Sequence, residues 1–178
     1  TALAVAPNGD ILSKYRKVNP WIPFEVHSSP HDIPGYDEPL FPVVDTPIGR
    51  IGCAICYDVR FPEMFHKLRQ AGSEVIFLPS NFTLQTGKDH WEVLCRARAI
   101  ETETYFVATG QTGSHLQGNE TRFTWGHSLV VDPWGHVISR ASDGVGYTVA
   151  RIEPDRVKRV RTMIPVAQHK VDMAKLKK

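Results

Sequence analysis

A cysteine stands where a strand pattern gives way to a helix pattern, a position from which a thiol can attack a substrate. The apolar run that ends at Cys56 is followed closely by Pro62, which suits the first turn of a helix. A thiol at such a junction can project above the edge of a sheet, and backbone N–H groups of the turn can face a developing oxyanion. On this spacing alone, Cys56 is equally compatible with a buried, inert thiol.

Cys53 and Cys56 form a C-x-x-C pair, which raises the alternatives of zinc binding and redox chemistry. One pair supplies half of a structural zinc site, and no second pair or suitable histidine cluster follows. Residues three apart in a strand point to opposite faces, so the two thiols are not expected to share a metal or a disulfide. We therefore expect no metal site and interpret Cys53 and Cys95 as core residues. An odd number of cysteines indicates a reducing, cytoplasmic setting.

A lysine and a glutamate could complete a site around Cys56. Lys17 follows an expected strand, and Glu25 lies in residues 19–42, a segment with six prolines that favours an ordered, irregular loop. In the functional interpretation, Lys17 places positive charge beside Cys56, and Glu25 hydrogen-bonds Lys17. In the alternative interpretation, both are solvated side chains.

Strands that could carry these residues are marked by apolar runs and turns. The run Val75–Leu78 is wholly apolar, as in a strand covered on both faces. Asp132, Pro133 and Gly135 occupy the first, second and fourth positions expected of a type I turn. The expected strands are residues 3–6, 11–15, 43–44, 50–56, 75–78, 105–109, 128–131, 136–139 and 147–152.

Three helices are expected between these strands. The first begins near Pro62 and ends at Gly72, a residue suited to a left-handed cap. The second is expected to begin at Asp89 with a capping box, and Pro154 opens a third. The apolar stripe of the second helix is expected to be Val93, Leu94, Ala97 and Ile100. Strands that alternate with helices predict the α/β class, with mixed sheets.

Composition and charge exclude several functional classes. The chain has 178 residues, of which 42% are hydrophobic and 22% charged, so it is not a disordered polymer. Residues 155–178 hold eight Lys/Arg and two Asp, a net +6, but they lack interleaved aromatics that could stack on bases. No apolar stretch approaches the ~20 residues of a membrane helix. We expect neither nucleic acid nor a membrane as a partner.

Four segments, in this order, resemble the nitrilase superfamily of carbon–nitrogen hydrolases. They are Tyr15-Arg16-Lys17, the Cys-Tyr-Asp-Val-Arg-Phe-Pro-Glu run at 56–63, His90-Trp91-Glu92 with residues 96–101, and Gly126-His127-Ser128 with residues 131–135. The resemblance implies an α-β-β-α sandwich, here incomplete at the N-terminus, and a homo-oligomer. It predicts that residues 1–165 are the C-terminal portion of such a domain and that residues 166–178 are a basic tail.

The resemblance also implies a Glu-Lys-Cys catalytic set. By motif, Cys56 is the nucleophile, Lys17 stabilises the tetrahedral intermediate, and the backbone N–H of Tyr57 is a second oxyanion donor. Glu25 matches a second glutamate that some members place after the lysine. The family's general-base glutamate lies upstream of the lysine, and this sequence begins after that position, so we expect this chain alone to be slow or inactive. No metal or organic cofactor is needed.

The expected reaction converts a small amide into a carboxylic acid and ammonia through an acyl-thioester on Cys56. Asn81 and Phe82 are expected to line the substrate site, and Arg60 is expected to hold a substrate carboxylate or to pair with Glu63 or another acid. Residues 90–92, 96–101 and 131–135 resemble the branch that hydrolyses ω-amides and deaminated glutathione, whereas the Lys17-to-Glu25 loop resembles aliphatic amidases. Nitrile hydrolysis by the same site and a non-catalytic assembly module are the alternatives.

Overall fold

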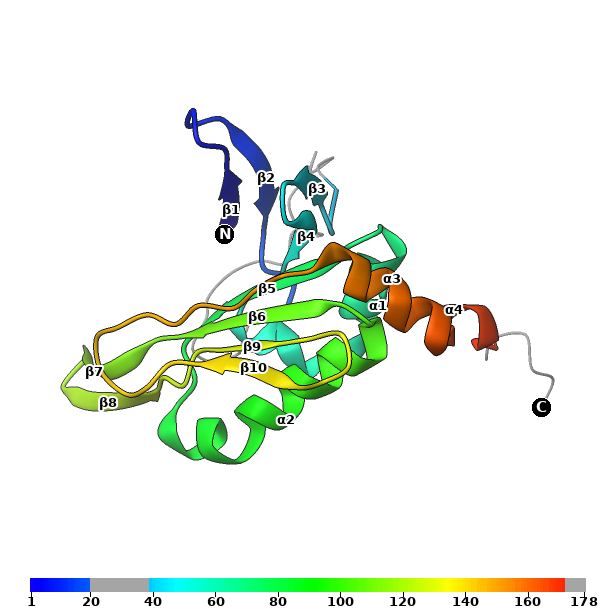
Figure 1. Ribbon diagram of the computed structural model, residues 1–178. Helices are drawn as coiled ribbons and strands as arrows, with labels where there is room; N and C mark the ends of the chain where they lie inside the picture. The colour runs from blue at the N-terminus through cyan, green and yellow to red at the C-terminus, as the bar shows by residue number, and fades with distance from the viewer. Residues whose placement is uncertain (20–38, 172–178) are drawn as a thin grey trace, which may run out of the picture.

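A six-stranded mixed sheet forms the centre of the computed structural model, which describes residues 1–19 and 39–171 (Figure 1). The strand order is β10-β9-β6-β5-β4-β3. The three central strands β4, β5 and β6 are parallel, and the remaining neighbours are antiparallel. The strands are β3 (Val43–Thr46), β4 (Gly49–Cys53), β5 (Val75–Ser80), β6 (Tyr105–Gly110), β9 (Leu129–Val131) and β10 (Val137–Arg140).

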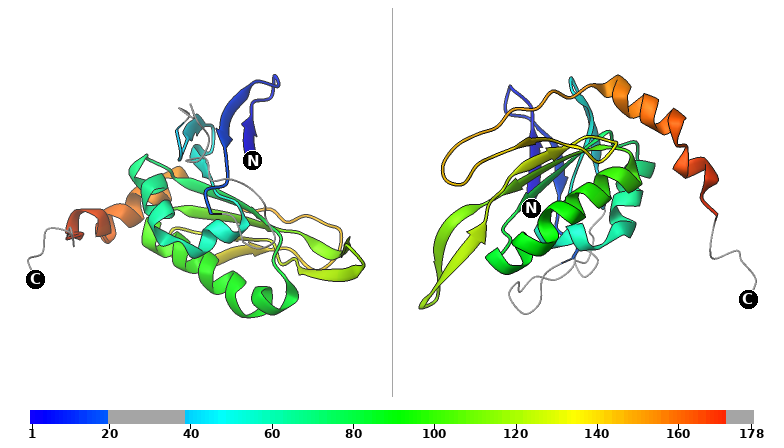
Figure 2. Two further views of the ribbon diagram at one scale, coloured as in Figure 1. Left: turned by 180° about the vertical axis from the view of Figure 1, so that it is seen from behind. Right: turned by 60° about the horizontal axis from the view of Figure 1, so that its bottom comes forward.

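Helices α1 (Pro62–Gln70) and α2 (Leu84–Thr102) cover one face of this sheet (Figures 1 and 2). Alternation along β5 explains the two layers, because Ile76 and Leu78 belong to the core cluster that includes both helices. Val75 faces the other way and packs with Val157 of α3 (Pro154–Met163). The α/β class is therefore confirmed, and the helices and sheet correspond to one α layer and one β layer of the expected sandwich.

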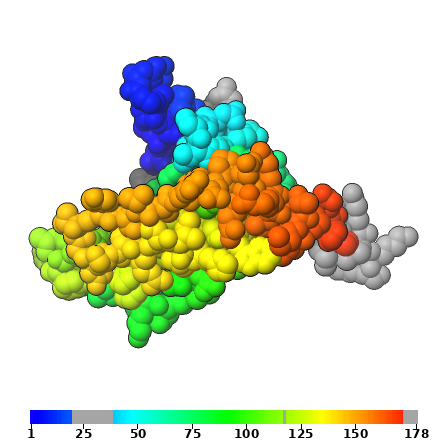
Figure 3. All heavy atoms as spheres, viewed as in Figure 1, coloured from blue at the N-terminus to red at the C-terminus, as the bar shows by residue number. Residues whose placement is uncertain are grey.

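Two β-hairpins form separate two-stranded sheets. Strands β1 (Ala2–Val5) and β2 (Ile11–Tyr15) form the first hairpin, which projects from the body of the molecule beside β3 and β4 (Figure 3). Strands β7 (Thr112–Gln117) and β8 (Glu120–Trp125) form the second. The second hairpin was not predicted, because its strands lack an alternating apolar face; the Gly118-Asn119 turn is the signal that could have revealed it.

The start and buried face of α2 differ from the prediction. The helix begins at Leu84, and the Thr83 hydroxyl caps it by accepting a hydrogen bond from the Thr86 N–H. Val93 and Ile100 are 67% and 50% exposed, so the predicted apolar stripe was wrong at these two positions, whereas Leu94 packs against the core as predicted. Tertiary packing selects a different helical face, whose buried residues are Gly87, Trp91, Cys95, Arg98, Ala99 and Thr102.

The C-terminal region confirms one expectation and corrects another. Pro154 opens α3 as predicted, whereas residues 147–152 form no strand and cross the molecule in an extended, irregular path (Figure 3). The short helix α4 (Val166–His169) follows. None of the helices described in the structure is long and apolar enough to cross a membrane.

The predicted type I turn at residues 132–135 is present and is organised by Asp132. The Gly135 N–H donates to the Asp132 carbonyl at 2.9 Å, and Asp132 Oδ1 accepts from the N–H groups of Trp134 and His136. Arg156 of α3 donates to Oδ2 of the same side chain. Burial alone would raise the pKa of Asp132, but these hydrogen bonds and the Arg156 charge hold it below its ordinary value.

Candidate active site

Cys56 lies just beyond β4 in a backbone conformation that is uncommon for a residue other than glycine. Its φ is 49°, and it opens the short 3-10 helix η2 (Cys56–Arg60). The strand ends at Cys53, three residues earlier than predicted, because the chain leaves the β-ladder before Cys56. Such strained positions cost about 1–3 kcal/mol each and persist where the surrounding structure holds them. The turn carries the thiol beyond the carboxyl edge of the sheet.

A pocket of about 730 Å³ lies at this edge. Its walls come from the carboxyl ends of three adjacent parallel strands, where open α/β sheets commonly bind ligands. The lining residues are Thr1, Lys17, Ile55, Cys56, Pro79, Ser80, Asn81, Thr109, Gly110 and Gln111. No carboxylate is included in this lining, within the part of the chain that the structure describes.

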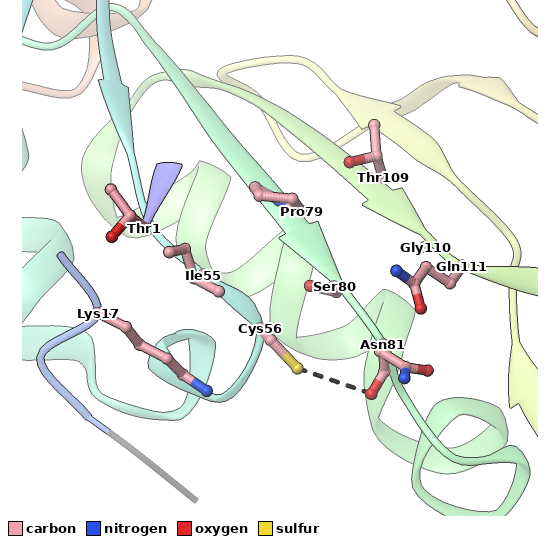
Figure 4. A pocket seen from close by; sticks show the side chains of 10 residues that line it. All are labelled: Thr1, Lys17, Ile55, Cys56, Pro79, Ser80, Asn81, Thr109, Gly110 and Gln111. Atoms are coloured by element: carbon pink, nitrogen blue, oxygen red, sulfur yellow. Dashed lines mark hydrogen bonds between the residues drawn. The ribbon is translucent and has the colours of Figure 1, made fainter. Parts of the chain in front are cut away.

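Lys17 and Cys56 both line this pocket, although 39 positions of sequence separate them. Lys17 follows β2, and its ammonium group extends toward the Cys56 side of the cavity (Figure 4). The Cys56 thiol lies 3.7 Å from the carbonyl oxygen of Asn81, across from Lys17. The structure therefore brings a cation and a thiol to one small-molecule-sized cavity.

The η2 helix is anchored by the buried side chain of Asp58, which accepts four hydrogen bonds. Oδ2 accepts from the Tyr15 hydroxyl at 2.7 Å and from the Ile55 N–H at 2.9 Å. Oδ1 accepts from the backbone and side-chain N–H groups of Asn19, both at 3.1 Å. Burial raises the pKa of Asp58, and the hydrogen bonds partly offset that rise. Burial and the neighbouring Asp58 raise the pKa of Tyr15, which keeps its hydroxyl protonated as a donor.

Of the predicted substrate residues Asn81, Phe82 and Arg60, the structure places only Asn81 in the pocket lining. Asn81 lines the pocket, whereas Phe82 is buried in the core and packs on Trp91 with a ring-centroid distance of 4.9 Å. Arg60 lies outside the pocket lining. Its guanidinium is 5.5 Å from the Phe82 ring centroid and 3.4 Å from His90 Nδ1. The alternative ion pair of Arg60 with Glu63 is absent from the described residues.

Tyr57 and Glu25 are the remaining predicted site residues. Tyr57 follows Cys56 in the first turn of η2, and its ring contacts Phe61 edge-on at 5.5 Å. Its predicted role as an oxyanion donor rests on the backbone N–H and stays a prediction. Glu25 lies outside the described residues, so its predicted contact with Lys17 also stays a prediction.

Sequence reasoning missed the pocket wall that β6 supplies. Thr109, Gly110 and Gln111 lie at the carboxyl end of this strand. A side chain at Gly110 would collide with the carbonyl oxygen of Gly126, so close backbone approach there requires glycine. The signal that could have revealed this wall is topological, because the carboxyl ends of adjacent parallel strands lie at the same edge of a sheet.

The three cysteines differ in environment, and none is disulfide-bonded. Cys53 and Cys95 are buried, and burial raises the pKa of both thiols. Cys56 is partly exposed in the pocket. This difference favours Cys56 as the reactive thiol. In the described residues, no group of three or more His, Cys, Asp or Glu side chains could hold a metal ion.

Comparison with known proteins assigns this chain to a family. A family model described as carbon-nitrogen hydrolase matches residues 1–162. Deaminated glutathione amidase of Synechocystis is 41% identical over 182 aligned positions, covering 96% of this chain and 63% of the relative. The mouse protein of the same name is 45% identical, covering 91% of this chain and 50% of the relative.

The fold agrees with that match. The crystal structure of the C. elegans NitFhit protein superimposes with a TM-score of 0.81 at 42% identity, covering 94% of this chain and 41% of that one. The chain belongs to the carbon-nitrogen hydrolase family, as the motif resemblance predicted. It spans about half to two thirds of the length of these curated relatives.

Proposed function

We propose that the protein is a thiol-dependent hydrolase of non-peptide carbon–nitrogen bonds that converts a small amide into a carboxylic acid and ammonia or an amine. The observation that carries the proposal is the meeting of Lys17 and Cys56 in one pocket at the carboxyl edge of the parallel strands. Membership of the carbon-nitrogen hydrolase family supports the same reaction class.

In the first half-reaction, the Cys56 sulfur attacks the amide carbonyl and forms a tetrahedral intermediate. The ammonium group of Lys17 and the Tyr57 N–H stabilise its oxyanion; one such donor is typically worth about 3 kcal/mol in the barrier. Collapse of the intermediate breaks the C–N bond. The proton that the thiol gives up is transferred to the nitrogen, which leaves as ammonia or an amine, and an acyl-thioester remains on Cys56.

In the second half-reaction, water attacks the thioester, releases the carboxylic acid and returns the thiol. We assign activation of this water to the glutamate that the family resemblance places before the lysine, because the pocket lining in the described residues includes no carboxylate. General-base help is typically worth ~10²–10⁴-fold in rate. Glu25 is proposed to orient Lys17.

The proposed substrate is an amide of the kind named by the relatives, with deaminated glutathione as the first compound to test. A pocket of about 730 Å³ lies within the range of ordinary small-molecule sites. Asn81 is proposed to contact the substrate, since it lines the cavity. Self-association of protomers and a cytoplasmic location stay predictions.

Substitution of each cysteine in the full-length protein tests the proposal. Cys56→Ala should reduce hydrolysis of deaminated glutathione to background, whereas Cys53→Ala and Cys95→Ala should retain most activity below their melting temperatures. Product formation is measured by liquid chromatography. Retained turnover in Cys56→Ala would refute the proposal, and faster turnover of a nitrile than of its matching amide would redirect it to nitrile hydrolysis.

A further inference from the structure

Among the described residues, Lys17 and Cys56 are carried by two different sheets. Lys17 follows β2, which forms a two-stranded sheet with β1, and Cys56 follows β4 in the central sheet. The register of the central sheet therefore cannot set the distance between the ammonium group and the thiol. Some other contact must fix it.

The side chain of Asp58 makes that contact. Tyr15 precedes Lys17 by two residues and Asn19 follows it by two, and both donate hydrogen bonds to the Asp58 carboxylate. On the cysteine side, Asp58 Oδ2 also accepts the N–H of Ile55, the residue immediately before Cys56. One carboxylate thus joins the chain on both sides of Lys17 to the turn that carries the nucleophile.

The cost of this arrangement argues that it has a role. Asp58 is 0% exposed, and a buried carboxylate is unfavourable unless donors satisfy it. Its four donors come from two separate segments, and Tyr15, also 0% exposed, places its hydroxyl in the core to supply one of them. An apolar side chain would fill the same space more cheaply but would not connect these segments.

We infer that Asp58 is a positioning residue that sets the geometry between Lys17 and Cys56. The inference rests on the proposed function, because it assigns Asp58 to the same reaction without contact with the substrate. Asp58 also holds the left-handed conformation of Cys56 through the Ile55 N–H. Loss of the carboxylate moves the ammonium group relative to the thiol while the pocket walls from β5 and β6 remain.

The test compares Asp58→Asn with Asp132→Asn in the full-length protein. Asp132 is a matched control, because it is also a buried carboxylate that accepts backbone N–H bonds, but its turn does not line the pocket. Asp58→Asn should lower kcat by about 10²-fold with little change in KM, as expected when reacting groups are misplaced by about 1 Å. Asp132→Asn should lose stability and keep kcat within about threefold of wild type.

Tyr15→Phe keeps the buried ring and removes one donor, so it decides the question if Asp58→Asn does not fold. It should lower kcat by about tenfold, a smaller loss than in Asp58→Asn, because it removes only one of the four donors to Asp58. It should also slow the alkylation of Cys56 by iodoacetamide. Measurement of the alkylation rate needs no substrate, so it tests the positioning role of Asp58 separately from the proposed hydrolase function.

The outcomes are distinct. Activity retained in Cys56→Ala would refute the proposed function. If Cys56→Ala is inactive, but folded Asp58→Asn and Tyr15→Phe keep wild-type kcat and alkylation rates, the positioning role of Asp58 is refuted and the proposed function is not. Equal losses of kcat in Asp58→Asn and Asp132→Asn would likewise overturn it, because a purely structural role predicts that equality.

Discussion

Removing the charge of Lys17 provides the most direct test of the proposed chemistry. Lys17→Met keeps a long, unbranched side chain at the pocket wall and deletes the ammonium group. Under the proposed mechanism this group donates to the oxyanion of the tetrahedral intermediate and makes little contact with the neutral carbonyl of the ground state. The loss should therefore fall on kcat rather than on KM.

The structure sets the size of the expected effect. Removing one oxyanion donor typically costs about 10²–10³ in kcat, or roughly 2.7–4 kcal/mol. Lys17 is only partly buried, so solvent screens its charge, and we expect the lower end of that range, a fall of about 10²-fold. The assay measures steady-state hydrolysis of deaminated glutathione by the full-length protein below the melting temperature of each variant.

Lys14 is the matched control for this substitution. It lies on β2, three residues before Lys17, but lines a separate hollow with Phe41 and Val43 rather than the Cys56 pocket. Lys14→Met should keep kcat within about twofold, as is usual for substitutions outside the reacting groups. Comparable activity of Lys17→Met and Lys14→Met would refute the assignment of Lys17 to the oxyanion.

Two further predictions concern thiol reactivity and pH. Iodoacetamide should modify Cys56 in the native protein and spare Cys53 and Cys95, whose burial raises the thiol pKa; peptide mass spectrometry would contradict this if a buried thiol reacted first. The lowered pKa of Asp132 contributes folding stability above the unfolded pKa of about 3.9, and that contribution is lost as pH falls below it. The stability difference between wild type and Asp132→Asn in urea unfolding should therefore shrink between pH 6 and pH 3, and a constant difference would show that the lowered pKa has no effect.

The sequence alone singled out the groups that we propose to react and predicted most of the regular elements. Pro62 and Gly72 bound α1 because proline suits a first helical turn and glycine a left-handed cap, and both signals are local. Val75–Leu78 is a central strand because both of its faces are covered. Residue type and motif are enough to single out Cys56 and Lys17 as candidates, because neither signal depends on the fold.

Tertiary structure decided which of these residues meet. The buried face of α2 follows packing against the sheet rather than local apolarity, so Val93 lies in solvent while Arg98 is buried and donates to the Val59 carbonyl. The β6 wall of the pocket exists only because parallel strands bring distant segments to one edge. Likewise, Asp58 links the segments of Lys17 and Cys56 through hydrogen bonds that span up to 43 positions of sequence. A local pattern cannot contain such contacts, because they form only when separate elements pack together.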